Sequence, residues 1–261
     1  MRIAAIYDIH GNLPALEAVL QDVRQAGVDH VVVGGDVLPG PMPREAIACL
    51  LDLDVPVHFI MGNGDREVLA VRRGIETGAV PEAFREAMRW NAQQLRQEDE
   101  ALLAGWPATL RIQIPGMGEV LFCHATPRND TEIFTRLTPD ERLLPVFEDL
   151  HMPVVVCGHT HMQFDRTIGR TRVVNAGSVG MPFGEPGAYW LLLGSDVRLR
   201  QTPYDLEKAA DRIRNTRYPQ AEDFAARNVV LPPSEGDMLD SFARAELSGP
   251  NPAPDITGER R

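Results

Sequence analysis

The stretch Ile3-Ala4-Ala5-Ile6-Tyr7-Asp8-Ile9-His10 opens the chain with an apolar run that ends in a carboxylate and an imidazole. The apolar part has the length and composition of a buried strand. Asp8 and His10 are two residues apart, so they project to the same side of an extended segment and both can bind one ion. The stretch therefore predicts a strand of an α/β sheet that ends at a metal site.

The same pattern, an apolar run followed closely by Asp, Asn or His, recurs four times downstream. The runs and their polar residues are Val31 to Val33 with Asp36, Val55 to Ile60 with Asn63 and Asp65, Val120 to Cys123 with His124, and Val154 to Val156 with His159 and His161. These strand ends never deliver Ser or Lys, which favours a metal site. The mixture of carboxylate, imidazole and amide suits Mn first, or Fe, Co, Ni or Zn, better than Ca or Mg.

Each of these residues also has an ordinary interpretation when taken alone. A single His at a strand end is more often structural, and Asp36 could cap a helix or a turn. We interpret His30, His58 and His151 as structural or surface residues, because they have no partners of this kind. Only the five pieces together, in this order, favour a metal centre.

Composition limits the classes of function. The chain has 261 residues, 44% of them hydrophobic, and a net charge of −11, which gives no basic surface for gripping a nucleic-acid duplex. Small nucleotide substrates remain possible, because metal ions supply local positive charge.

No apolar run reaches the length of a membrane span, about 18 residues, and Met1 leads directly into a strand, so we expect a cytoplasmic protein without a membrane partner. Three cysteines at wide spacing predict no disulfide framework, and homo-oligomerisation stays open.

The first 75 residues alternate between strand and helix patterns, which favours a parallel sheet with helices on its faces. Residues 81–105 form a helical excursion, and strand patterns dominate afterwards up to Gln201. Helices are expected at 138–150, 205–216 and 220–227. We therefore predict one domain over residues 1–231. The Pro-, Gly- and acid-rich tail at 232–261 is expected to be partly disordered, with a short helix at 237–247 and a mobile last dozen residues.

The combined pattern resembles that of the calcineurin-like metallophosphoesterases, most of all their small bacterial and archaeal phosphodiesterase branch. The resemblance covers about residues 1 to 200 and rests on Asp8-x-His10, Gly35-Asp36, Gly62-Asn63-x-Asp65, His124 and Gly158-His159-x-His161. It implies a four-layer αββα sandwich of two mixed β-sheets flanked by helices. It also implies that Asp8, His10 and His161 hold a first metal, that Asn63, His124 and His159 hold a second, and that Asp36 bridges them. Asn175-Ala176-Gly177-Ser178 resembles the Asn-Pro-Gly-Ser turn of that branch, with Ala in place of Pro.

Two cations with a shared hydroxide can attack phosphorus in line. The catalytic residues predicted on this basis are Asp36, Asp65 and His124. Asp65 either orients His124 or a water, or caps the following helix. Arg66 and Arg128 could clamp a phosphate oxygen, although an ion pair is an equal alternative, and Asn12 could contact substrate, although helix capping would explain it.

One position departs from the family pattern. Many relatives carry His in the third position of Gly-Asn-x-Asp, where it resembles a general acid, whereas this chain has Gly64. General acid catalysis contributes about 10²- to 10⁴-fold in rate. We therefore expect leaving groups that need little protonation, such as those of aryl diesters, cyclic nucleotides or phosphoanhydrides.

The sequence thus favours a dinuclear-metal phosphodiesterase acting on small or nucleotide-like diesters. Dinucleoside polyphosphates or phosphoprotein monoesters are alternative substrates. A protein-binding scaffold of the same fold, like the retromer subunit, is an alternative of another class, although such scaffolds usually lose metal ligands and this chain has seven. Phe84, Trp90 and Trp106 could form a base-stacking pocket, but we interpret them as core.

Overall fold

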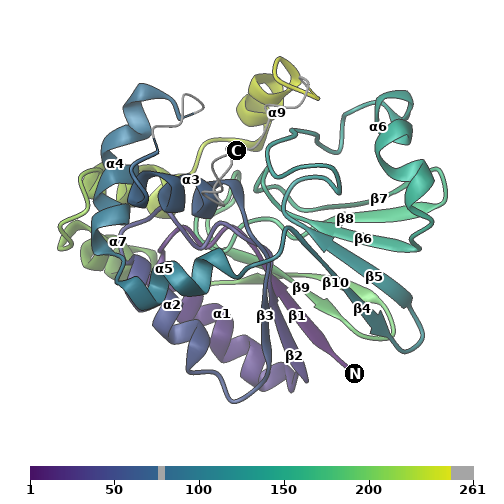
Figure 1. The fold of residues 1–261 in the computed structure, drawn as a ribbon, viewed down its shortest axis with the longest axis horizontal. Coiled ribbons are helices and arrows are strands. Elements are labelled where there is room, and N and C mark those ends of the chain that lie inside the picture. The colour runs from purple at the N-terminus through teal and green to yellow at the C-terminus, as the bar shows by residue number, and fades with distance from the viewer. Residues whose placement is uncertain (76–79, 248–261) are drawn as a thin grey trace, which may run out of the picture.

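The computed structural model describes residues 1–75 and 80–247, and its centre is a pair of five-stranded mixed sheets (Figure 1). We call the first sheet A; its strands, in spatial order, are β10 (Val197–Thr202), β9 (Ala188–Leu193), β1 (Ile3–Ile6), β2 (His30–Val33) and β3 (Val57–Phe59). We call the second sheet B; its order is β4 (Thr109–Ile114), β5 (Gly118–Cys123), β6 (Val154–Cys157), β8 (Thr171–Asn175) and β7 (Phe164–Ile168).

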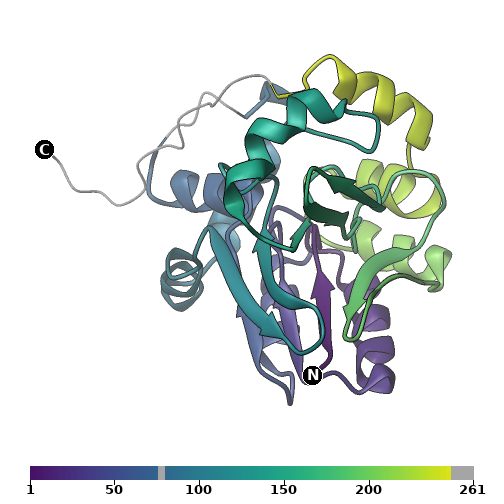
Figure 2. The ribbon, with the colours of Figure 1, turned by 90° about the vertical axis from the view of Figure 1, so that its right-hand side faces the viewer.

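Helices cover the outer faces of both sheets (Figures 1 and 2). Those of the N-terminal half are α1 (Leu13–Ala26), α2 (Pro43–Leu51), α3 (Asn63–Arg72), α4 (Glu82–Gln94) and α5 (Gln97–Ala104). Those of the C-terminal half are α6 (Asp140–Phe147), the 3₁₀ turn η1 (Glu148–Leu150), α7 (Leu206–Arg214), α8 (Ala221–Phe224), the π-helix η2 (Ala225–Val230) and α9 (Glu235–Ala243). None of these described helices is both long and apolar enough to cross a membrane.

Three apolar clusters separate the four layers. Successive residues of a strand point to opposite faces, so β1 turns Ile3 and Ala5 toward sheet B and Ala4 and Ile6 toward the helices. A third cluster joins the outer face of sheet B to α6, for example through Phe147. The predicted four-layer αββα sandwich is confirmed.

Three parallel strands lie side by side in each sheet: β1, β2 and β3 in sheet A, and β5, β6 and β8 in sheet B. Their carboxyl ends therefore meet at one edge of the sandwich. In open α/β sheets this edge is where ligands bind.

The predicted helical excursion is the pair α4 and α5, and the helix expected at 220–227 continues as η2 to Val230. The helix expected at 237–247 begins at Glu235 and ends at Ala243. The residues that follow it dock on the loop before α6, where the Leu247 N–H donates to the Ile133 carbonyl over 3.0 Å. The expected mobility of the last dozen residues falls on positions outside the described ranges.

Candidate metal centre

Every predicted ligand follows a parallel strand, in a loop or, for Asn63, at the start of a helix. Sheet A delivers Asp8 and His10 after β1, Asp36 after β2 and Asn63 at the start of α3 after β3, and sheet B delivers His124 after β5 and His159 and His161 after β6. The structure brings all seven to the shared edge of the two sheets, and the carboxylates and imidazoles form two buried groups of potential ligands.

The backbone at these positions is strained. Seven residues other than glycine have positive φ in the described chain, and five of them are Asp8, His10, Asp36, His159 and His161, with φ between 47° and 68°. This left-handed conformation costs roughly 1–2 kcal/mol for a residue with a Cβ. Strain of this kind collects at functional sites, where the surrounding structure enforces it.

The first group contains Asp8, His10 and His161. Nε2 of His161 lies 3.4 Å from Oδ1 of Asp8 and 3.3 Å from Nε2 of His10. The far nitrogen of each ring faces a carbonyl, with Nδ1 of His161 2.6 Å from the Met181 oxygen and Nδ1 of His10 3.3 Å from the Pro39 oxygen. Donation from Nδ1 leaves the lone pair on Nε2, so both rings are set for metal binding.

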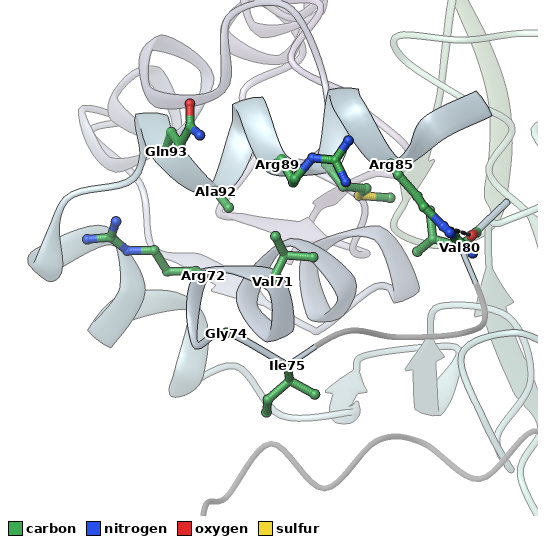
Figure 3. Close-up of a pocket in the computed structure, with 10 residues that line it drawn as sticks. Val71, Arg72, Gly74, Ile75, Val80, Arg85, Arg89, Ala92 and Gln93 are labelled. Atoms are coloured by element: carbon green, nitrogen blue, oxygen red, sulfur yellow. Dashed lines mark hydrogen bonds between the residues drawn. The ribbon is translucent and has the colours of Figure 1, made fainter. Parts of the chain in front are cut away.

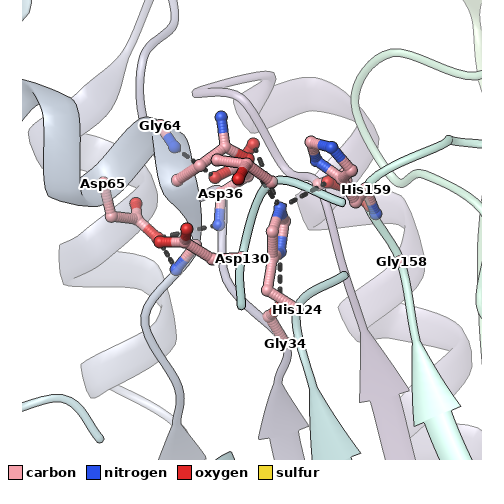
Figure 4. A network of polar contacts seen from close by, with 12 residues as sticks. Gly34, Asp36, Gly64, Asp65, His124, Asp130, Gly158 and His159 are labelled. Carbon is pink, nitrogen blue, oxygen red and sulfur yellow. Dashed lines mark hydrogen bonds and ion pairs between the residues drawn. The ribbon is translucent and has the colours of Figure 1, made fainter. Parts of the chain in front are cut away.

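The second group contains Asp8, Asp36 and His124. Asn63 and His159 lie against His124, with the His124 and His159 ring centroids 5.1 Å apart (Figure 4 shows both rings). Nε2 of His124 lies 3.5 Å from Oδ2 of Asp36, and Nδ1 of the same ring is fixed by the Gly34 oxygen at 2.9 Å. One atom of the Asn63 amide lies 3.0 Å from both Nε2 of His124 and Nδ1 of His159. If that atom is the amide oxygen, its lone pairs and those of the two ring nitrogens face the same point, as the ligands of a cation do.

Two carboxylates lie between the groups. Oδ2 of Asp36 is 3.7 Å from Nε2 of His10 and 3.5 Å from Nε2 of His124, so it faces both groups, as expected of a bridging ligand. Oδ1 of Asp8 is also placed between them, 3.4 Å from Nε2 of His161 and 3.9 Å from Nε2 of His124. The geometry therefore gives Asp8 a shared position beside Asp36, where the sequence indicated Asp36 alone.

These residues fit a pair of cations. Oδ1 of Asp8 is buried and accepts no hydrogen bond, and a buried carboxylate oxygen without a partner is costly. Nε2 of His10 and Nε2 of His161, which both carry lone pairs, face each other at 3.3 Å, an arrangement that a cation between them would stabilise. Together the two buried triads are consistent with a dinuclear site.

Protons take up part of this charge in the metal-free protein. Burial would lower the pKa of His124, but the Asp36 carboxylate outweighs it and raises that pKa to about 10. Burial would raise the pKa of Asp36, yet the neighbouring histidines, His124 first, bring it well below its usual range. Burial lowers the pKa of His159 to about 4. Cations must therefore displace a proton from His124.

Asp65 lies beside the Asp36 loop and holds it in place (Figure 4). Its carboxylate accepts from the backbone N–H groups of Asp36 at 2.7 Å, Leu38 at 2.9 Å and Gly62 at 3.1 Å. Burial and the adjacent Asp36 charge raise the pKa of Asp65 to about 8, against the effect of these donors. Of the roles predicted for Asp65, the structure supports capping and loop positioning rather than a contact with His124.

The three side chains predicted to bind substrate are occupied elsewhere. Asn12 is fully buried, caps α1 through Ala15 and donates to the Gly180 carbonyl. The Arg66 guanidinium is buried between Asp130 and Glu67, and Arg128 pairs with Glu132. The prediction of phosphate-clamping arginines is therefore not supported, because acidic side chains already hold both guanidinium groups.

The turn Asn175-Ala176-Gly177-Ser178 joins the ligand loops of the two sheets. The Asn175 amide donates to the Gly158 carbonyl at 2.7 Å, and the Ser178 hydroxyl donates to the Asp8 carbonyl at 2.8 Å. Replacement of Pro by Ala in this turn thus leaves these bonds in place.

A cleft of about 350 Å³ adjoins the ligands, and His10, Asp36 and Asn63 form part of its wall. The remaining wall comes from α3, α4 and several loops, and includes Glu67 of α3, which the sequence did not indicate. Tyr218, Gln220, Phe224 and Asn228, from the segment 218–228 around α8 and η2, were also not indicated. No local motif marks these positions, since they reach the site only because α8 and η2 fold back beside α4. Phe84 also lines the cleft and is 51% exposed, so its interpretation as core is wrong, whereas Trp106 is buried and stacks on Phe59.

A larger cavity of about 640 Å³ lies between α3 and α4, with Arg72, Arg85 and Arg89 at its rim (Figure 3). It contains none of the predicted ligands. It shares Val80 and Met88 with the cleft, so these two side chains separate the two spaces.

The fold is a sandwich of two mixed sheets with helices outside, and a buried cluster of Asp and His residues lies at the common edge of the sheets. These features define a metal-binding domain of the two-sheet sandwich class. The family model of the calcineurin-like phosphoesterase superfamily domain matches residues 1–196. The chain therefore belongs to this superfamily and is a metallophosphoesterase domain.

Similar proteins occur in archaea and bacteria. The chain is 28% identical over 242 residues to the uncharacterized protein MJ0912 of Methanocaldococcus jannaschii, covering 84% of this chain and 94% of that protein. It is similar to the crystal structure of a metallophosphoesterase from Sphaerobacter thermophilus, with TM-score 0.68, 26% identity, and 89% and 99% of the two chains covered. Hypothetical protein PH1004 from Pyrococcus horikoshii OT3 has the same fold, with TM-score 0.75, 21% identity and the same coverage. The likeness thus extends past residue 196 into the C-terminal helices.

Proposed function

We propose that the protein is a dinuclear-metal phosphodiesterase that hydrolyses small or nucleotide-like phosphodiesters. The observation that carries the proposal is the convergence of seven donor side chains from two sheets beside a cleft. Manganese is the first choice of metal, with Fe, Co, Ni or Zn as alternatives, because the donors mix carboxylate, amide and imidazole. When bound, two such ions activate water and neutralise phosphoryl oxygens.

In the proposed reaction, one water adds to phosphorus and one P–O ester bond breaks, which yields an alcohol or phenol and a phosphomonoester. The protein's own part is to hold donors in fixed orientations. The carbonyl of Gly34 fixes the His124 ring, and the N–H of Gly64 donates to Oδ1 of Asp36 at 2.7 Å. Ser178 is not a nucleophile in this reaction, because its hydroxyl is engaged by the backbone of Asp8 and Met181.

Charge favours a diester over a monoester. A monoester carries close to two negative charges at neutral pH, whereas a diester carries one. Among the described residues that line the cleft there is no Arg or Lys, and Glu67 and Asp223 add negative charge. The nearby guanidinium group of Arg66 is already neutralised by Asp130 and Glu67. The same charge balance disfavours a polyphosphate chain lying along the cleft.

The packing at Gly64 supports a preference for good leaving groups. A Cβ at this position would lie 2.4 Å from the Leu38 carbonyl oxygen and 3.0 Å from Oδ1 of Asp36. A histidine side chain therefore has no room here without movement of the Asp36 loop. We infer that the reaction proceeds without a proton donor at this position, which suits phenols and other acidic leaving groups.

The test is a substrate panel with the purified, Mn-reconstituted protein. It includes 4-nitrophenyl diesters, cyclic nucleotides, dinucleoside polyphosphates and 4-nitrophenyl phosphate, together with alkyl diesters of matched size. We expect the highest kcat/KM on aryl diesters and a steep fall with rising pKa of the leaving group. Faster turnover of the monoester would contradict the proposal, and equal rates on aryl and alkyl diesters would remove the leaving-group argument. Two tightly held metals without turnover of any ester would favour the scaffold instead.

A further inference from the structure

The cleft beside the ligands has a composition that a bare phosphate does not require. Because His10, Asp36 and Asn63 line one end, one ester arm of a phosphodiester held by these ligands would extend into the space beyond. The residues around that space therefore select the arm.

The walls of this space are apolar and aromatic. Pro81, Phe84, Met88, Tyr218 and Phe224 line it, and Phe84 has about half of its surface exposed. The Trp90 ring packs edge-on against the Tyr218 ring, with 5.5 Å between the two centroids. A flat ring entering here would cover the Phe84 side chain and lie against other rings.

Polar groups without partners occur among these apolar walls. Oε2 of the buried Glu67 accepts no hydrogen bond, while Oε1 pairs with Arg66 at 2.8 Å. Within the described chain, the amide of Asn228 and the hydroxyl of the buried Tyr218 also form no hydrogen bond. Buried polar groups in native proteins are normally paired, so the buried, unpaired Oε2 of Glu67 indicates a ligand that donates a hydrogen bond there. The half-buried Asn228 amide and the Tyr218 hydroxyl also line the cleft and offer such a ligand further donors and acceptors.

Asn228 is placed in the cleft by an unusual backbone. It lies in the π-helix η2, Ala225–Val230. Such wide turns are rare and occur often at functional sites. The π-helix continues directly from α8, which carries Phe224, so one short segment brings an aromatic and an amide side chain to the same wall.

Resting on the proposed function, we propose that this cleft is a subsite for the nucleoside arm of the phosphodiester substrate. A nucleoside is uncharged, which matches a lining without Arg or Lys. Its base is flat, and its sugar hydroxyls can donate to a carboxylate, as they do in dinucleotide-binding sites. A purely alkyl arm would leave Glu67, Tyr218 and Asn228 unpaired. The volume of about 350 Å³ is near the lower end of the range for ligand pockets and suits one nucleoside.

The test compares two diesters with the same leaving group, adenosine 5′-(4-nitrophenyl) phosphate and methyl 4-nitrophenyl phosphate, on the Mn-reconstituted protein. We expect kcat/KM to be higher for the nucleoside ester by about 10-fold or more. Phe84→Ala and Asn228→Ala should each lower this ratio by several-fold. The Phe84 side chain is about half exposed, and the half-buried Asn228 amide forms no hydrogen bond within the described chain, so both variants should fold. Leu51→Ala, an exposed apolar residue of α2 outside the cleft, is the matched control and should keep the ratio.

A second measurement separates this inference from the proposed function. Isothermal titration calorimetry of the Mn-loaded protein should show tighter binding of adenosine 5′-monophosphate than of methyl phosphate, and Asn228→Ala should reduce the difference. If neither diester is hydrolysed but this difference is observed, the phosphodiesterase proposal fails and the subsite stands. Equal kcat/KM for the two diesters, with equal binding of the two monoesters, would overturn the subsite.

Discussion

Sheets A and B are similar in architecture but contribute different chemistry to the site. Each places three parallel strands side by side and delivers ligands from their carboxyl ends. Sheet A supplies two carboxylates, one amide and one imidazole, whereas sheet B supplies imidazoles only. All the negative charge that holds cations therefore comes from sheet A, and sheet B adds neutral nitrogen donors.

Each of the two groups of ligands also takes residues from both sheets, so neither sheet can form a site alone. Bonds between the ligand loops fix the two halves together. The His159 N–H donates to Oδ2 of Asp8 at 2.9 Å, and Nδ1 of His124 meets the Gly34 oxygen at 2.9 Å. The comparison implies that losing a carboxylate of sheet A should disturb both cations, whereas losing an imidazole of sheet B should disturb mainly one.

Asp36→Asn is the strongest test of this difference. The change removes a charge from the carboxylate that faces both groups, so we expect loss of both metals and a fall in turnover of more than about 10²-fold. By comparison, mutating a residue that only hydrogen-bonds to a metal ligand typically lowers metal affinity or activity by about 10- to 100-fold. Metal content by plasma mass spectrometry and the rate on an aryl diester provide the two readouts. Asp54→Asn, at an exposed position, is the matched control. Near-wild-type metal content in Asp36→Asn would show that this carboxylate is not shared.

His161→Ala tests the other half of the comparison. His161 contacts Asp8 and His10 but belongs only to the first group, so we expect the metal content to fall from about two to about one per chain. Turnover should fall too, because the proposed reaction uses both ions. Equal loss of both metals would mean that the groups are not separable, and the contrast between the sheets would then be wrong.

The positions of the ligands could be predicted from the sequence, since each follows an apolar strand directly. The conformation of the ligand loops could not be predicted. Five ligands have positive φ, and this conformation depends on hydrogen bonds to distant residues, such as the bond from the Ser178 hydroxyl to the Asp8 carbonyl. The cleft was also not predictable. Phe84, Tyr218 and Asn228 are far apart in the chain, and only the return of the C-terminal helices beside α4 brings them together.

The partners of Arg66 illustrate the same limit. Its position next to Asp65 suggested a phosphate clamp, but Asp130, from a loop 64 residues away, binds the guanidinium through two bonds of 2.7 and 3.0 Å. The sequence around a charged residue does not show which oppositely charged side chain the tertiary fold places next to that residue. Of the two roles predicted for Arg66, phosphate clamp and ion pair, the structure shows the ion pair.

The pH dependence of stability provides a smaller effect that again separates the two sheets. In the metal-free protein the carboxylates of sheet A raise the pKa of His124 in sheet B to about 10, above the ordinary 6.5. A group whose pKa is higher in the folded state stabilises the fold fully below pH 6.5 and loses that contribution as the pH rises toward 10. We therefore expect the midpoint of thermal unfolding of the chelated protein to fall between pH 7 and pH 9.5.

The metal-loaded protein should lack this fall, because His124 is then already deprotonated. Calorimetric metal titrations in buffers of different ionisation enthalpy should show proton release on binding, with affinity that increases with pH. Proton uptake on metal binding, or a chelated protein whose stability rises with pH over this range, would contradict the assignment of His124. His124→Ala, which cannot hold the proton, should flatten the profile of the chelated protein above pH 8, where Asp65 is already ionised.

Gly64→Ala is expected to have the smallest effect and tests how tightly the carboxylate loop of sheet A is packed. Inside a helix, Gly→Ala normally stabilises by roughly 0.5–1 kcal/mol. Here the new Cβ would lie 2.4 Å from the Leu38 oxygen, so we expect a loss of about 1–3 kcal/mol, the usual cost of overpacking. Gly236 occupies the equivalent second position of α9 and has only the Ser234 hydroxyl nearby, at 4.0 Å. Gly236→Ala should therefore stabilise by the ordinary amount. Urea unfolding of both variants measures the two changes in the free energy of unfolding. If Gly64→Ala stabilises the protein, the Asp36 loop can move aside, and packing does not exclude a larger side chain at position 64.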